Sequence, residues 1–123
     1  MNDPIFCGAV DIGGTKIASA LFTASGDISA RDKTPIDRAG GDAAAAQVAG
    51  RVEALAAAAR EAGGRLAAVG LCVPGIAYSA TGRVWAPNIQ GWDQYPLLEK
   101  IRGHVPSVHV PAGPAIPLVL ESD

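Results

Sequence analysis

Apolar and polar residues alternate along the first part of the chain, as they do in strands with one covered face. Ile5–Ile12, Lys16–Phe22 and Ile28–Lys33 are separated by turn residues, which predicts three successive strands. From Asp42 to about Ala62 the apolar residues recur at helical spacing, with Asp42 as the expected cap. We therefore expect an antiparallel meander followed by a helix.

The second half of the chain predicts a parallel strand and several shorter elements. Leu66–Val73 is almost continuously apolar, which is typical of a parallel strand buried on both faces. A short β excursion around Arg83–Trp85 is expected next, then a short helix over Tyr95–Arg102 and a strand over Val105–Val110. Prolines interrupt the remaining residues, so Ala115–Glu121 predicts at most a weak helix.

The turn between the first two predicted strands carries the main candidate chemistry. Its adjacent glycines, Gly13 and Gly14, predict a tight hairpin with positive φ whose backbone N–H groups can face an anion. Thr15 and Lys16 add a hydroxyl and a positive charge. Because Asp11 would repel a bare anion, the pattern indicates a metal-bridged phosphate such as Mg·ATP. The alternative is an ordinary hairpin with its charged side chains in solvent.

Length, composition and charge limit the kinds of partner that the sequence predicts. A chain of 123 residues has the size of one domain. Its net charge of −2 and pI near 5.6 do not indicate a basic surface that would bind nucleic acid or an anionic membrane. The sequence shows neither the pattern of a signal peptide nor an apolar segment long enough to span a membrane, so we expect a cytoplasmic protein. Cys7 and Cys72 are expected to be buried small hydrophobes, about 15 Å apart along parallel strands and beyond disulfide reach.

Three motifs at consistent spacing resemble those of the ROK family, which contains bacterial glucokinases, related sugar kinases and repressors. They are Asp11–Lys16, Gly70–Gly75, and Ala86–Asn88 followed by Gly91–Trp92. The resemblance covers residues 5 to about 110. It implies an α/β fold, a ribonuclease H-like (actin-like ATPase) lobe. Such a lobe has a mixed sheet with antiparallel first three strands and parallel later strands, flanked by helices.

The resemblance also implies ligands, namely ATP with Mg²⁺ and a hexose-type sugar. It implies that the first hairpin binds ATP phosphates and that Asp11 helps to place the metal ion. The phosphate-binding residues would be Gly13, Gly14, Thr15 and Lys16.

For the sugar, the resemblance implies that Gly75 borders the pocket and that Asn88 hydrogen-bonds sugar hydroxyls. The alternative for Asn88 is a turn residue that follows a proline. Trp85, Trp92 and Tyr95 could stack on a sugar, but we expect them to form the small core of the β excursion.

The chain departs from the family after the last predicted strand. In the family that strand is followed by an acidic residue and then Asn-Asp-Ala-Asn, whose aspartate is the catalytic base. Aligning Val108–Val110 with it places Gly113 at the base and Ala112 at the sugar-binding asparagine, and neither can accept a proton. Glu121 and Asp123 come later and are not expected to substitute. No catalytic residue is therefore assigned.

We expect residues 1–110 to form the N-terminal lobe, and residues 111–123 a divergent, proline-rich tail left by truncation or a frameshift. The second lobe and the family's zinc motif are expected to be absent, so this lobe of an ATP-dependent sugar kinase should not turn over alone. The alternatives are a non-catalytic sugar or nucleotide sensor and a fragment of a ROK transcriptional repressor. Exposed apolar surface could make the lobe a homo-oligomer.

Overall fold

The computed structural model describes residues 3–104 and 116–122 of the chain. Most predicted elements are confirmed within a few residues. In chain order the elements are β1 Ile5–Ile12, β2 Lys16–Thr23, β3 Ile28–Pro35, α1 Gly41–Glu61, β4 Arg65–Val73, β5 Ile76–Tyr78, β6 Arg83–Trp85, α2 Leu97–His104 and β7 Leu118–Ser122.

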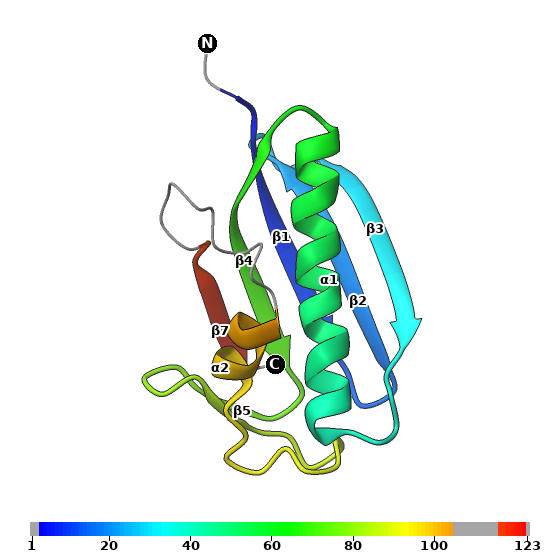
Figure 1. The fold of residues 1–123 in the computed structure, drawn as a ribbon, viewed down its shortest axis with the longest axis vertical. Helices are drawn as coiled ribbons and strands as arrows, with labels where there is room; N and C mark the ends of the chain where they lie inside the picture. Colours follow the sequence, from blue (N-terminus) through cyan, green and yellow to red (C-terminus); the bar gives the residue numbers. More distant parts are fainter. Residues whose placement is uncertain (1–2, 105–115, 123) are drawn as a thin grey trace.

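The described strands form one mixed five-stranded sheet, in the order β3-β2-β1-β4-β7, and a separate β5-β6 hairpin (Figure 1). Strands β1, β2 and β3 pair antiparallel, whereas β4 pairs parallel with both β1 and β7. The predicted mixed sheet is confirmed. Because β1 and β4 are parallel neighbours, the turns that follow them lie at the same edge of the sheet.

Strand β7 differs from the element that the sequence predicts for this part of the chain. The weak helix expected over Ala115–Glu121 is wrong, because Leu118–Ser122 pairs with β4 from Val69 to Val73. These residues form a strand because buried and exposed side chains alternate along β7 and because its hydrogen-bonded partner lies far away in the sequence. The strand predicted over Val105–Val110 lies outside the described residues.

Helix α1 lies across the sheet and buries one face against β1, β2 and β4. Its predicted cap is wrong. The cap residue is Gly40, whose φ of 63° is in the region that favours glycine, and no side chain caps the helix. Asp42 lies in the first turn instead, where its carboxylate makes contacts described below.

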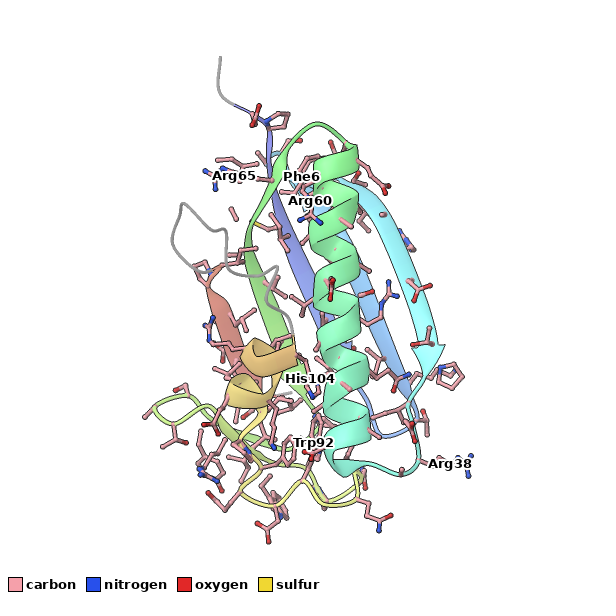
Figure 2. All side chains as sticks on the ribbon, in the orientation of Figure 1. Phe6, Arg38, Arg60, Arg65, Trp92 and His104 are labelled. Carbon is pink, nitrogen blue, oxygen red and sulfur yellow. The ribbon has the colours of Figure 1, made fainter. Side chains whose placement is uncertain are left out.

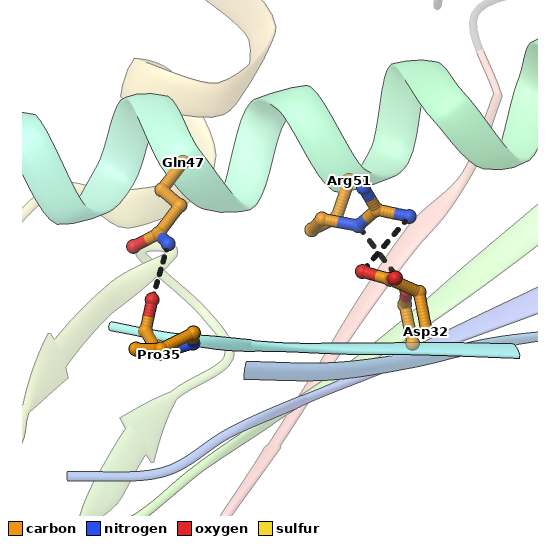
Figure 3. Close-up of polar contacts among 5 residues, drawn as sticks. Asp32, Pro35, Gln47 and Arg51 are labelled. Carbon is orange, nitrogen blue, oxygen red and sulfur yellow. Dashed lines mark hydrogen bonds and ion pairs between the residues drawn. The ribbon is translucent and has the colours of Figure 1, made fainter. Parts of the chain in front are cut away.

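Polar side chains of α1 tie it to β3 on the edge of the sheet. Figure 3 shows Arg51 approaching Asp32, an ion pair of 3.5 Å, and Gln47 donating to the Pro35 carbonyl oxygen at 2.6 Å. The Gln47 side-chain oxygen also accepts a hydrogen bond from the Asp37 N–H at 2.8 Å. One side chain thus fixes the loop that leaves β3.

Both helices lie on the same side of the main sheet (Figure 1), and none of the described elements covers the other side. The expectation that β4 is buried on both faces is therefore wrong: Leu71 and Val73 are buried, while Gly70 is exposed and Cys72 half-buried. Cys7 is also exposed, so the cysteines are not buried as expected. No helix in the described part of the chain is long and apolar enough to cross a membrane.

Candidate functional site

The hairpin between β1 and β2 differs in detail from the prediction. Neither Gly13 nor Gly14 has positive φ, and the Gly13 N–H donates within the turn to the Lys16 carbonyl oxygen at 2.8 Å. Gly13 therefore does not offer its N–H to a ligand. Within the described residues, no group accepts a hydrogen bond from the Gly14 or Thr15 N–H. Two backbone donors of this turn remain available.

Gly14 is required because of its neighbour rather than its φ angle. A Cβ atom on Gly14 would lie 2.9 Å from the Cβ of Asn88, closer than two carbon atoms approach. Thus the candidate phosphate turn and the candidate sugar residue are in van der Waals contact.

A hollow of about 700 Å³ opens beside this contact. It lies between Gly14 and Thr15 of the hairpin, residues 35–38 and Gly40 at the end of β3 and after it, and residues 87–90, which include Asn88. Asn88 is exposed, so its side-chain amide is accessible to a ligand. The volume is in the range of small-molecule sites.

The loop that carries Asn88 is closed on itself and tied to the first turn of α1. Across its base the Ala86 N–H donates to the Trp92 carbonyl oxygen at 2.8 Å. From α1, the Gly41 N–H donates to the Gln90 carbonyl oxygen at 2.7 Å, and the Trp92 indole Nε1 donates to the Gly41 carbonyl oxygen at 3.1 Å.

The aromatic residues of this region form a core, as expected, with one exception. Trp92 and Tyr95 are 1% and 8% exposed, and their rings stack with centroids 5.4 Å apart. Trp92, labelled in Figure 2, lies beside the lower end of α1. Trp85 is exposed instead, so it does not belong to this core.

Asp42 and Tyr95 form the main polar contact of the region. The Tyr95 hydroxyl donates to the Asp42 carboxylate at 2.6 Å, and the Lys100 ammonium is 3.6 Å from the same oxygen. The hydrogen bond and the positive charge lower the pKa of Asp42. Burial and the neighbouring carboxylate raise the pKa of Tyr95. Both groups are therefore held in their ordinary states at neutral pH.

Asp11 lies apart from this hollow. It is exposed on the uncovered face of the sheet and lines a second hollow of about 590 Å³ with Arg31 and Lys33. In the described part of the chain, no three His, Cys, Asp or Glu side chains converge on a metal position. A single exposed carboxylate two residues before the hairpin does suit Mg²⁺, which is usually held by one or two carboxylates plus phosphates and water.

Gly75 and Lys16 line neither hollow. A Cβ atom on Gly75 would collide with the Trp85 carbonyl oxygen, so this glycine allows the turn after β4 to pack on β6. Beyond that turn, the Ala77 N–H donates to the Ser122 hydroxyl at 2.8 Å. The end of β7 is thus joined to β5, the strand that follows β4.

Sequence reasoning missed the contribution of residues 36–42. Asp37 and Gly40 line the hollow, Gly41 bonds the Asn88 loop, and Asp42 accepts a hydrogen bond from Tyr95. The adjacent glycines before a predicted helix were an available signal, because Gly40 packs against the Gln90 backbone where a side chain would not fit.

The ROK family model matches residues 7–110 of the chain. Among solved structures, a ROK hexokinase from Thermus thermophilus is 29% identical with a TM-score of 0.69, over 95% of this chain and 35% of that protein. A ROK glucokinase from Streptomyces griseus, solved with glucose and AMPPNP, is 27% identical with a TM-score of 0.71, over 95% and 33%.

A ROK transcriptional regulator homologous to E. coli MLC has a TM-score of 0.72 at 17% identity, over 97% and 28% of the two chains, which shows the shared fold alone. The comparison with curated proteins gives no match. The chain spans about a third of the length of the first two kinases. The predicted actin-like lobe is confirmed by these neighbours, and the match over residues 7–110 shows that the chain belongs to the ROK family.

Proposed function

We propose that the chain is the N-terminal lobe of a ROK sugar kinase, which transfers a phosphoryl group from ATP to a hexose hydroxyl. The observation that carries the proposal is the contact between Gly14 and Asn88 beside a hollow of about 700 Å³. It joins a turn with two available backbone donors to an exposed amide. Structures of a ROK hexokinase and of a glucokinase with glucose and AMPPNP support this ligand class.

For ATP, the proposal uses the N–H groups of Gly14 and Thr15 and the charge of Lys16 as phosphate ligands. Gly13 shapes the turn, because its own N–H is occupied by the Lys16 carbonyl oxygen. Asp11 is the candidate ligand of Mg²⁺, which when bound neutralises phosphate charge.

For the sugar, Asn88 is the candidate hydrogen-bonding residue, and Gly75 supports the pocket by letting the turn after β4 pack on β6. The hydroxyl of Ser122 accepts a hydrogen bond from the Ala77 N–H at 2.8 Å. This contact supports a pocket in which the end of β7 and strand β5 lie together.

For the base, the pairing of β7 supports a different alignment from the ungapped one. Among the described residues, the strand that follows α2 and pairs with β4 is Leu118–Ser122. The family pattern of an acidic residue followed by Asn-Asp then falls on Glu121, Ser122 and Asp123. We propose that Asp123 is the catalytic base and that Gly113 is not at that position. Serine then replaces the family's sugar-binding asparagine.

In this mechanism Asp123 accepts the proton of the sugar hydroxyl as the hydroxyl oxygen bonds to the γ-phosphorus. The bond from that phosphorus to the β,γ-bridging oxygen breaks, and ADP leaves with the electron pair. The Gly14 and Thr15 N–H groups and Lys16 stabilise charge on the transferring phosphoryl oxygens. Phosphoryl transfer depends on exact placement of these groups, and the chain spans about a third of the ROK hexokinase it resembles. We therefore propose that these 123 residues bind ligand but turn over little or not at all by themselves.

The proposal is tested by titrating ¹⁵N-labelled protein with AMPPNP and Mg²⁺, then with glucose, up to about 10 mM, where even weak sites fill. We expect nucleotide to shift the Gly14 and Thr15 amide signals and glucose to shift the Asn88 side-chain signals. Sulfate is the control for a general anion nest. Equal shifts with sulfate and nucleotide, or no response to glucose, would contradict the proposal.

A further inference from the structure

We propose that Asp42 is a positioning residue, which acts through Tyr95 to hold the loop carrying Asn88 against the Gly14 turn. The inference rests on the proposed function only for the identity of the ligand. Asp42 itself lines neither hollow, so its effect on the site is indirect.

The first step is the contact between an exposed acid and a buried phenol. The Asp42 side chain is 69% exposed, whereas Tyr95 is 8% exposed and its hydroxyl donates to the carboxylate at 2.6 Å. Without Asp42 this hydroxyl loses the only acceptor it has among the described residues. A buried hydroxyl without an acceptor is unfavourable, so the Tyr95 ring would move to find water.

The second step leads from Tyr95 to the Asn88 loop. The Tyr95 ring stacks on Trp92, whose carbonyl oxygen accepts the Ala86 N–H and whose N–H donates to the Ile89 carbonyl oxygen at 3.2 Å. The Ile89 N–H in turn donates to the Ala86 carbonyl oxygen at 3.0 Å. Asn88 lies inside this closed set of bonds, and a shift of Trp92 moves its backbone.

The third step is the fit to the phosphate turn. A Cβ atom on Gly14 would lie only 2.9 Å from the Asn88 Cβ, so the two loops are already in close contact. The same first turn of α1 holds the loop twice more, through Gly41 to Gln90 and to Trp92. Asp42 adds the side-chain contact that a substitution can remove without disturbing the helix backbone.

The test compares Asp42→Ala, Asp42→Asn and Tyr95→Phe with Asp32→Asn. Asp32 is a matched control, because it is also an exposed carboxylate paired with a cation, Arg51 at 3.5 Å, but it lies on β3. Hydrogen exchange of the Ile89, Trp92 and Gly41 amides is measured with the Asn88 side-chain signals, the thermal midpoint and the dissociation constant for glucose.

We expect Asp42→Ala to raise exchange of these amides about tenfold or more, to shift the Asn88 signals, and to weaken glucose binding several-fold. Asp42→Asn should recover part of each effect, because an amide oxygen also accepts from Tyr95. Asp32→Asn should change none of them. Unchanged exchange and Asn88 signals in Asp42→Ala, or the same changes in Asp32→Asn, would overturn the inference. If the wild type binds no glucose, the proposed function fails while exchange still tests Asp42.

Discussion

At the scale of single residues, Gly14 is the position where the proposed site has least freedom. Replacement by alanine puts a Cβ atom 2.9 Å from the Asn88 Cβ, and relieving such a contact typically costs about 1–3 kcal/mol. We expect Gly14→Ala to lower the free energy of unfolding by that amount and to abolish the nucleotide-induced amide shifts.

Gly50 provides the control for Gly14. It lies in the interior of α1, where a Cβ meets nothing within 4 Å. Gly50→Ala should therefore stabilise the protein by about 0.5–1 kcal/mol, with nucleotide shifts unchanged. Chemical denaturation measures both variants, and a Gly14→Ala protein that binds nucleotide normally would contradict the assigned contact.

The Asp42–Tyr95 pair predicts how stability depends on pH. The pKa of Asp42 is lowered from its ordinary 3.8, so its contribution is present above that pH and is lost as pH falls through the folded-state pKa. The pKa of Tyr95 is raised above its ordinary 10.0, so stability falls as pH rises beyond 10. Tyr95→Phe should flatten the alkaline limb and Asp42→Asn the acidic limb of a melting-temperature profile. Unchanged limbs would contradict the pair.

At the scale of elements, the link between α1 and the loop after β3 decides the shape of one wall of the hollow. Gln47 bonds both the Pro35 carbonyl oxygen and the Asp37 N–H. We expect Gln47→Ala to cost about 1–2 kcal/mol and to speed hydrogen exchange of the Asp37 amide. Glu53→Ala, an exposed change on the same helix, is the control and should do neither. Equal exchange in both variants would contradict this role.

Some secondary-structure elements could be predicted from the sequence and others could not. Strands β1 and β2 were predictable, because their alternation and the turns beside them are local signals. Strand β7 was not, because Leu118–Ser122 follows prolines and its partner β4 is about fifty residues earlier. The motifs predicted Gly14 and Asn88 as candidate site residues, but the role proposed for Asp42 depends on Tyr95, a contact between distant residues.

At the scale of the whole molecule, the uncovered face of the sheet is the main feature. Its small side chains are bordered by exposed apolar ones, including Val119 at 50% and Ile28 at 48% exposure. Apolar patches of this kind favour association, so we expect sedimentation to show concentration-dependent self-association that Val119→Lys weakens. Ile76→Lys, on the β5-β6 hairpin, is the control. A monomer at all concentrations would contradict this expectation.

The central claim is the proposal that Asp123, the residue after β7, is the catalytic base. The most direct measurement is glucose-dependent ATP consumption by a fusion of residues 1–123 with the remaining part of the Streptomyces griseus glucokinase. We expect Asp123→Asn to lower the rate about 100-fold or more, because a general base is lost, and Gly113→Asp to leave it unchanged. A rate that survives Asp123→Asn, or that rises with Gly113→Asp, would contradict the account.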